Sequence, residues 1–547
     1  MRIILCLIII TTLLLHGIAY SAPDLQNALK DLKNSAPHIR QNAVIQLGSS
    51  GDMSVSSYLM PMLSDKDPSV KAAVCWAISQ LKPPNSARNL LPLLSDSDPE
   101  VRICALSTLG SLGDSSIGES IVRLTYDPDT RVKKSAINSL GQLRYASAGP
   151  RLSVLMSDSN PEIRTACALA MKNMSFTPPD SIVGTGLSDS DSRVRAVSAE
   201  GMGTSPSASL SPQLIAALKD PNAEVRKNAA ASLGQTANSQ AIKPLMGALY
   251  DSSQDVSSSA GVALGMIGKQ AIEPLKAEFF QAPHRIKLNI IKAYSFMRDA
   301  GAQELATLTK YPELREAVIS ALGDTKAEAA LPSVINALND GDEKIRNTAV
   351  TALGKIGIPS IAKLKDAMSS KKLNVRKGIA KALGLIPGQE STAVLVNLLA
   401  DEDESVVAIA SVSLSKMGEP ARPALMKALN SDDDMQRAGA INALSLMGKQ
   451  SLTALINSLY DKSAKVRAGA ALGIGQMDGK AAIGQLVDLM QKDTDTDVKR
   501  ACAWTIGRIG DSSLIDMLVM EKTRAAGKGQ SDLQITIEKA IQSIQGR

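Results

Sequence analysis

Aromatic residues are scarce in this chain of 547 residues: Phe, Tyr and Trp together make up 3%, and only three residues are His. Large enzymes with deep pockets usually line them with bulky and aromatic side chains, so the composition argues against such a fold. The hydrophobic fraction is nevertheless 44%, which excludes a disordered chain. An apolar content built from small residues instead suits many short helices packed closely together.

No single sign of charge dominates the chain. Lys and Arg number 60 against 54 Asp and Glu, a formal net charge of +6. Spread over this length, that charge is too dilute to be the electrostatic footprint of a nucleic-acid-binding protein. We therefore expect no specific nucleic-acid partner.

Long apolar runs are absent except at the N-terminus, where one extends from Ile3 to Leu15. Arg2 precedes it and the small-x-small sequence 19–21 follows it, an arrangement typical of a secretory signal peptide. Thirteen residues rise only about 20 Å as a helix, less than the roughly 30 Å of a bilayer core, so an uncleaved anchor is the weaker alternative. We expect cleavage after residues 1–21, a periplasmic or secreted location, and no transmembrane span in the mature chain.

The mature chain is one repeat copied about sixteen times. Asp96–Asp114 aligns with Asp340–Ile358, and an apolar anchor recurs every 28 to 32 residues, most often every 31. A fixed period in this range indicates a solenoid. The anchor positions are Ile39, Val70, Val101, Val132, Ile163, Val194, Val225, Val256, Ile286, Leu314, Ile345, Val375, Val406, Gln436, Val466 and Val498.

Each copy is predicted to form two helices. In the second, apolar or small residues fall at positions 0, +4, +7, +8 and +11 from the anchor, which is one face of a 3.6-residue helix. Asp98 followed by Pro99 predicts a capped start, and Gly113 predicts the end. The first helix is shorter, as at 241–249, and neither helix buries enough apolar surface to be stable alone.

These runs have the form D-x-D-P-x-V-R-x-x-A-x-x-A-L-G-x-[LI]-G and are clearest at Asp96–Gly113, Asp340–Gly357 and Asp461–Gly475. The pattern resembles the HEAT-like repeat family in the short form of phycobilin lyase subunits. The resemblance implies an all-α superhelical solenoid of about sixteen helix pairs over residues 22–520, with partners bound along its concave, second-helix face. Residues 521–547 depart from the pattern and are expected to be a linker, at 525–530, and a C-terminal capping helix.

A basic residue follows the anchor in fourteen of the sixteen copies. We interpret it as a structural ladder in which each base binds an Asp-rich turn of its own or the adjacent copy. A polyanion-binding stripe is the alternative, disfavoured because the aromatic stacking expected of nucleic-acid recognition is missing. Representative ladder positions are Arg102, Arg164, Arg226, Arg346 and Arg467.

Catalytic, cofactor-binding and metal-ligating residues are not assigned. The mature chain has two His residues, His38 and His284, and no His or Cys spacing typical of a metal site. The resemblance suggests an alternative, an enzyme or enzyme subunit of the lyase or deoxyhypusine-hydroxylase kind. The His–Glu pairs that hold iron in that hydroxylase family do not occur here.

Four cysteines lie outside the signal segment, and we expect them to be small core residues. They are Cys75, Cys104, Cys167 and Cys502. A disulfide between Cys75 and Cys104 of adjacent copies is the alternative in an exported protein. Their unequal register makes the required Cα separation of about 5–6 Å unfavourable.

Two regions are candidate partner-binding sites. Trp76 and Trp504 occupy position +6 on the face opposite the core, where an exposed Trp is a favoured interface anchor. Lateral packing of both rings is an equal alternative. The second region is an aromatic cluster at the irregular ninth and tenth copies, a binding patch or else the filling of an irregular turn. It comprises Phe279, Phe280 and Tyr311, with Arg285 nearby.

The function expected from these observations is non-catalytic. We predict a monomeric scaffold or adaptor in the bacterial cell envelope that binds a protein or peptide partner.

Overall fold

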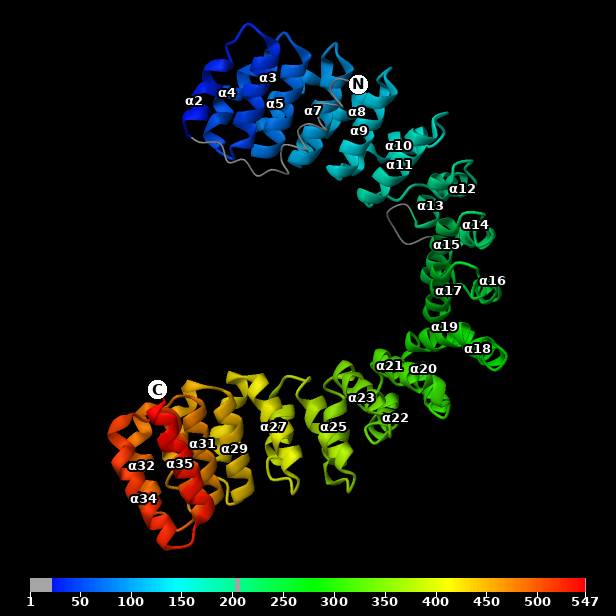
Figure 1. Cartoon of the computed structure of the whole chain (residues 1–547). Coiled ribbons are helices and arrows are strands. Elements are labelled where there is room, and N and C mark those ends of the chain that lie inside the picture. The colour runs from blue at the N-terminus through cyan, green and yellow to red at the C-terminus, as the bar shows by residue number, and fades with distance from the viewer. Residues whose placement is uncertain (1–21, 202–206, 547) are drawn as a thin grey trace. The chain divides into compact units, whose positions relative to one another are not determined.

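The computed structural model describes residues 22–201 and 207–546. In these residues every regular element is an α-helix or a short 3₁₀ turn, and no strand occurs. The expected signal peptide at 1–21 lies outside the described residues. The chain forms two compact units, Met1–Asn289 and Ile290–Arg547, each a row of helix pairs that follow one another in chain order (Figure 1).

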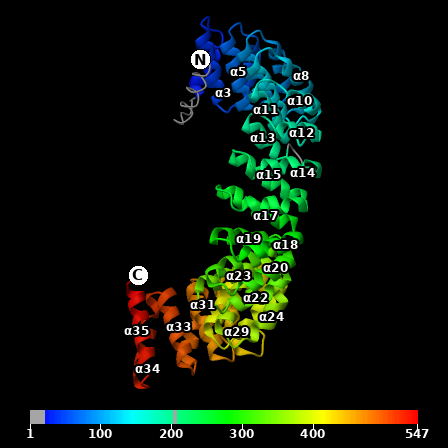
Figure 2. The same ribbon diagram turned by 90° about the vertical axis from the view of Figure 1, so that its right-hand side faces the viewer.

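In the first unit, second helices, called long helices below, alternate with first helices that are mostly shorter. Within this unit, α13 and α15 lie on one side and α12 and α14 on the other (Figure 2). The long helices are α3 (Pro37–Ser49), α5 (Pro68–Leu81), α7 (Pro99–Leu112), α9 (Thr130–Gln142), α11 (Pro161–Asn173), α13 (Ser192–Ala199), α15 (Ala223–Thr236) and α17 (Gln254–Ile267). The short helices are α2 (Ala22–Asp31), α4 (Ser56–Leu59), α6 (Ser86–Leu90), α8 (Gly118–Val122), α10 (Gly149–Leu155), α12 (Asp180–Leu187), α14 (Ser211–Ala217), α16 (Ile242–Ala248) and α18 (Ile272–Phe279).

The second unit continues the same alternation, and α19 (His284–Ser295) spans the boundary between the units. Its long helices are α21 (Arg315–Thr325), α23 (Glu343–Ile356), α25 (Leu373–Leu383), α27 (Glu404–Met417), α29 (Asp434–Leu446), α31 (Ala464–Gln476) and α33 (Thr496–Ile509). The others are α20 (Arg298–Leu308), α22 (Leu331–Ala337), α24 (Ser360–Asp366), α26 (Gln389–Leu398), α28 (Arg422–Ala428), α30 (Leu452–Ser458), α32 (Ile483–Lys492), α34 (Ile515–Gly527) and α35 (Ser531–Gln545).

Packing between consecutive pairs confirms the predicted all-α solenoid. Within each unit, each long helix contacts the next long helix, as α5 does α7 and α31 does α33. The anchors from Val70 to Val256 are fully buried. The core of each unit is therefore a layer between its two rows of helices, to which successive copies contribute one face each.

The predicted helix ends are also confirmed. The side chain of Asp98 accepts a hydrogen bond from the backbone N–H of Glu100 at the start of α7. Gly113 ends that helix with φ of 77°, a left-handed conformation that glycine adopts without steric cost.

Each rung of the basic ladder joins two adjacent copies. Arg226 donates to both carboxylate oxygens of Asp251, at 2.7 and 2.8 Å. Its third nitrogen donates to the carbonyl oxygen of Asp220, at 2.8 Å, in the turn of its own copy. Asp251 in turn accepts the backbone N–H of Ser253 at 2.8 Å, so one rung fixes the turns of two copies at once.

The ladder is unbroken from Arg40 to Asp251 in the first unit, where Ser257 replaces the next base, and it is interrupted again in the second. The first unit contains the rungs Arg40–Asp65, Lys71–Asp96, Arg102–Asp127, Lys133–Asp158, Arg164–Asp189, Arg195–Asp220 and Arg226–Asp251. The second unit contains Arg315–Asp340, Arg376–Asp401, Arg437–Asp461 and Arg467–Asp493.

Arg346 binds the turn of its own copy, through the carbonyl oxygens of Asp340 and Gly341, which is one of the two partners predicted for a ladder base. It forms no rung to the next copy, because Lys371 stands where the carboxylate would lie. One detail of the sequence prediction is wrong: the expected linker at 525–530 is helical as far as Gly527, where α34 ends. The predicted terminal helix is present as α35, which buries Leu533 and Ile537 against α33 and α34.

The rung yields a stability prediction. Hydrogen bonds from Arg226 hold the pKa of the Asp251 carboxyl below its usual value, so the charged form stabilises the fold. Asp251→Asn is expected to lower the free energy of unfolding by about 1 to 2 kcal/mol at pH 7. This stabilisation is complete above the unfolded pKa of about 4 and is lost as the pH falls through the lower folded value, so the gap between the two proteins narrows at about pH 3.

Urea denaturation of both proteins at the two pH values measures this gap. Glu224→Gln is the matched control, because Glu224 forms an exposed pair with Lys227 and its loss changes stability by less than about 0.5 kcal/mol. If the difference in free energy of unfolding between the wild-type and Asp251→Asn proteins is the same at both pH values, the rung does not contribute the stability described.

Close approach of neighbouring long helices yields a second prediction. A β-carbon added at Gly234 in α15 would lie 2.7 Å from the Cα of Ala263 in α17, whereas one added at Gly247 in α16 meets no atom within 4 Å. Alanine improves helix propensity at both positions. Thermal denaturation should show Gly234→Ala destabilised by about 1 to 3 kcal/mol and Gly247→Ala unchanged or stabilised by up to about 1 kcal/mol. Equal effects would show that the helices do not depend on this contact.

Candidate functional site

The long helices of the second unit expose a line of large apolar side chains, one from each of five successive helices. They are Leu385, which directly follows the last turn of α25, Val412 in α27, Leu446 in α29, Leu472 in α31 and Trp504 in α33, and they are 39 to 53% exposed. Each lies at position +6 or +10 from its anchor, away from the buried positions 0, +4, +7 and +8. We call these five residues the apolar stripe.

The residues of the stripe stand on helices that are neighbours, and Leu385 and Val412 line the same recess. α25 contacts α27, α27 contacts α29, α29 contacts α31, and α31 contacts α33. Single exposed apolar residues are common on protein surfaces, but a contiguous apolar patch bordered by polar residues marks an interaction site.

One end of the stripe contains a recess between α25 and α27. It has a volume of about 420 Å³, and its walls include Leu385, Val412 and the aliphatic residue Ile409. Lys381 and Lys416 also line it and are exposed. The recess can therefore accept an apolar side chain while the two ammonium groups remain at its rim.

The other end is formed by Trp504. The guanidinium of Arg508 lies 5.7 Å from the centre of the Trp504 ring and donates to the carbonyl oxygen of Gly475 at 2.9 Å. Both side chains line a second recess of about 640 Å³, together with Lys539 of α35 and Asp478. This end combines an aromatic surface with basic groups, a common composition for an interface anchor.

The helix positions that carry the stripe and flank it hold basic residues and no acidic ones, although Asp478 lines the recess at Trp504. The fifteen positions at +2, +6 and +10 of α25, α27, α29, α31 and α33 include five basic residues and no carboxylate. The basic residues are Lys377, Lys381, Lys416, Arg500 and Arg508. Arg500 pairs with Asp497 at 3.0 Å. The other positions hold the apolar stripe, three alanines, Asn442 and Gln476.

The equivalent positions in the first unit have a different character. There position +10 is occupied mainly by amide and hydroxyl side chains, and the apolar residues that are exposed on the long helices do not form a line. Position +10 holds the exposed Gln80, Ser111, Gln142, Asn173 and Gln235. The apolar exceptions are Leu169 and Met266, which are 41 and 44% exposed and stand three copies apart.

Of the two predicted Trp anchors, only Trp504 is exposed. Trp76 is half-buried and packs against the core of the first unit, where a β-carbon on Gly48 of α3 would come within 3.1 Å of its ring. Trp504 packs in the same way over Gly475 of α31 but keeps 40% of its surface exposed. Lateral packing therefore accounts for Trp76, and Trp504 has a free surface in addition.

The predicted aromatic cluster separates into core and surface residues. Phe279 is 3% exposed, so its assignment as a partner-binding residue is wrong. Its edge-to-face neighbour Phe280 is 62% exposed, with the ring centres 6.0 Å apart. Arg285 is exposed and donates to the carbonyl oxygen of Asp251 at 3.3 Å, and Tyr311, in the second unit, is half-buried. Packing thus explains part of this cluster.

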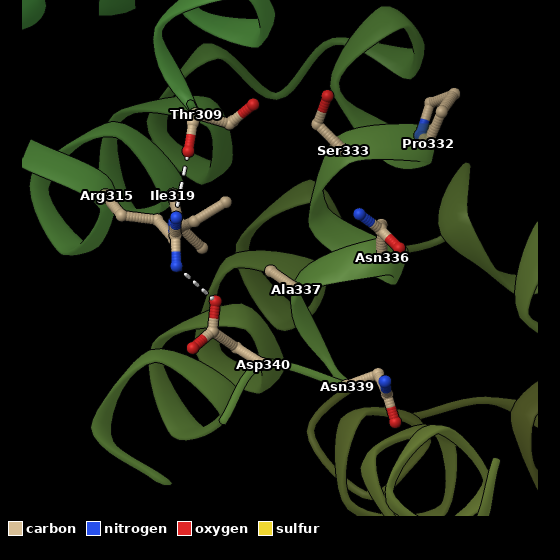
Figure 3. A pocket seen from close by; sticks show the side chains of 9 residues that line it. All are labelled: Thr309, Arg315, Ile319, Pro332, Ser333, Asn336, Ala337, Asn339 and Asp340. Atoms are coloured by element: carbon tan, nitrogen blue, oxygen red, sulfur yellow. Dashed lines mark hydrogen bonds and ion pairs between the residues drawn. The ribbon is translucent and has the colours of Figure 1, made fainter. Parts of the chain in front are cut away.

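A polar pocket beside α21 and α22 belongs to the ladder rather than to a separate site (Figure 3). Arg315 donates to the carbonyl oxygen of Thr309 at 3.0 Å and to Asp340 at 3.1 Å. Asn336 and Ser333 of α22 face this rung across a space of about 630 Å³. The charged groups of the pocket are therefore already paired with each other.

Burial makes the four cysteines of the described residues poor nucleophiles. The four cysteines are free thiols, and burial raises the pKa of Cys104 to about 11 and of Cys167 and Cys502 to about 12. Such thiols carry almost no nucleophilic thiolate at neutral pH. Within residues 22–201 and 207–546, no group of three or more His, Cys, Asp or Glu side chains could hold a metal ion.

The sequence pattern of HEAT repeats matches most of the chain. The matches cover residues 56–118, 119–203, 181–265, 212–285, 302–373, 361–445 and 452–523. The chain belongs to the HEAT-repeat family. No curated protein matches its sequence.

Solved structures are similar to this HEAT-repeat chain at low sequence identity. Yeast importin-β is 13% identical, with 96% of this chain and 88% of that chain covered and a TM-score of 0.45. The complex of CpcE and CpcF of phycocyanin lyase from Nostoc is 16% identical, with 48% and 94% covered and a TM-score of 0.27. In the described part of this HEAT-repeat chain, no helix is both long and apolar enough to span a membrane.

Sequence reasoning found position +6 but missed position +10, and with it Leu385 and Leu446. The signal was present, because both leucines lie one helical turn beyond +6 and outside the core pattern. Positions 0, +4, +7, +8 and +11 define the buried face of the repeat. An apolar residue at any other position of the second helix does not face the core, so it is a candidate surface residue.

The two tryptophans provide a test of this surface. Trp76→Phe leaves the exposed Trp504 as the only tryptophan, and Trp504→Phe leaves the half-buried Trp76. Because acrylamide quenches accessible rings, the Trp76→Phe protein should show the larger quenching constant and the emission maximum at longer wavelength. Equal quenching of the two variants would contradict the described exposure of Trp504.

Proposed function

We propose that this protein is a non-catalytic interaction scaffold or adaptor of the bacterial cell envelope. Its partner is a protein or peptide bound along the second-helix face, and the apolar stripe of the second unit is the main contact.

The apolar stripe is the observation that supports this function. Apolar residues at five successive helices leave a surface in water that gains free energy when a partner covers it, at about 25 cal/mol for each Å² of apolar area buried. The repeat core does not need these side chains, because its own positions are filled. Trp504 and Arg508 at one end are of the residue types that most often dominate binding energy.

The sequence of residues 1–21 supports the location. An apolar run of signal-peptide length with a small-x-small exit directs export. The thiols of Cys75, Cys167 and Cys502 are buried, and those of all four cysteines have raised pKa values. Such thiols persist without forming disulfides in an oxidising compartment, so the cysteines are compatible with export.

Photo-crosslinking in intact cells tests the function. A photoreactive amino acid at Leu446 is expected to give a discrete crosslinked protein in the envelope fraction. The matched control places the same amino acid at Met426 of α28, an apolar residue of similar exposure, 41%, outside the stripe. The mass of the purified protein should correspond to a chain that begins at Ala22.

Identical crosslinks from both positions, or none from Leu446, would overturn the interaction face. A chain that retains residues 1–21 in the cytoplasm would overturn the location.

A further inference from the structure

The spacing and charge of the apolar stripe specify the class of its partner. We propose that the stripe binds an amphipathic helix, apolar along one side and acidic along its flanks, which crosses the long helices of the second unit. This inference rests on the proposed function and adds the chemistry of the bound segment.

The first argument is the distance between apolar side chains. Neighbouring packed helices are 8 to 10 Å apart, and the stripe offers one apolar residue from each of five neighbours. Seven residues of an α-helix advance about 10.5 Å. A partner helix with an apolar residue in each heptad therefore meets one stripe residue at each step, whereas an extended strand turns successive side chains to opposite faces.

The second argument is the width of the stripe. Leu385 and Leu446 lie at position +10, whereas Val412, Leu472 and Trp504 lie at +6. These positions are one helical turn apart, about 6 Å along each helix. The apolar side of an amphipathic helix is a band at least 100° wide rather than a single line, so it covers both positions.

The third argument is charge complementarity. Five basic residues and no carboxylate occupy the fifteen positions at and beside the stripe, and Lys381 and Lys416 have no acidic partner among the described residues. Carboxylates on the flanks of the bound helix would reach these ammonium groups at the rim of the recess. A second copy of this chain would instead bring two basic faces together, so self-association through the stripe is disfavoured.

An anionic lipid surface is negatively charged, as the acidic helix is, but it is flat. The recess between α25 and α27 has a volume of about 420 Å³ and can receive one protruding side chain, which a flat bilayer surface does not supply. We therefore assign the stripe to a helical protein segment and make the lipid an arm of the test.

The probe is a synthetic, fluorescently labelled helix of about 28 residues, since five contacts about 10 Å apart span about 40 Å. It carries Leu on one side and Glu on both flanks. Comparison probes have Lys in place of Glu, or the same composition in shuffled order. Anionic phosphatidylglycerol vesicles form the lipid arm. Fluorescence anisotropy with the mature chain, Ala22 to Arg547, measures the binding of each peptide, and co-sedimentation measures the binding of vesicles.

The acidic helix should bind at least about tenfold more tightly than either comparison peptide, and added salt should weaken its binding. Leu446→Ser is expected to weaken it about tenfold, and Lys381→Glu combined with Lys416→Glu to reverse the preference between the acidic and the basic helix. Met426→Ser is the matched control and should leave binding unchanged. Circular dichroism checks that each variant keeps its helical content.

Several results overturn the inference: no binding of the acidic helix, equal binding of the acidic and basic helices, binding unaffected by Leu446→Ser, or binding to vesicles alone. If crosslinking from Leu446 in cells still gives a discrete protein, only the class of partner is wrong. If that crosslink is also absent, the proposed function fails as well.

Discussion

Each helix pair of this protein is stable only because the next pair covers its apolar face. A pair of short helices cannot offset the conformational entropy of its own ordering, so burial between copies supplies the free energy. The anchors from Val70 to Val256 are fully buried by this stacking. The Arg–Asp rungs add a second link at the same junctions, since Arg226 holds its own turn and the Asp251 carboxylate of the next copy.

Because the core and the rungs stabilise the repeat, the exposed positions of the long helices are free to vary. In the first unit they carry mostly amides and hydroxyls such as Gln80 and Gln142, whereas in the second unit they carry the apolar stripe and a basic border. The ladder changes between the units as well: seven consecutive rungs run from Arg40 to Asp251 in the first and end at Ser257, whereas Arg346 and Val407 interrupt it in the second. One repeat therefore provides two surfaces of different chemistry without altering the core.

Much of the fold was predictable because its rules are local and repeated. Helix caps such as Asp98, the ending glycine Gly113 and the core positions act within one copy or between adjacent copies, so sixteen examples in one sequence reveal them. The failures occurred where the copy is irregular. Phe279 is buried beside a turn that departs from the repeat, and the expected linker at 525–530 is helical as far as Gly527.

The sequence by itself determined the family, the number of copies, the capped helix ends and the pairing of most basic residues with Asp-rich turns. Only the tertiary structure showed that Trp76 is covered while Trp504 is exposed, and that Leu385, Val412, Leu446 and Leu472 form a line with Trp504. The physical reason is that exposure depends on what the neighbouring copy places beside a side chain. A periodic sequence specifies which residues face the core, but the packing of adjacent helices decides which of the others remain in water.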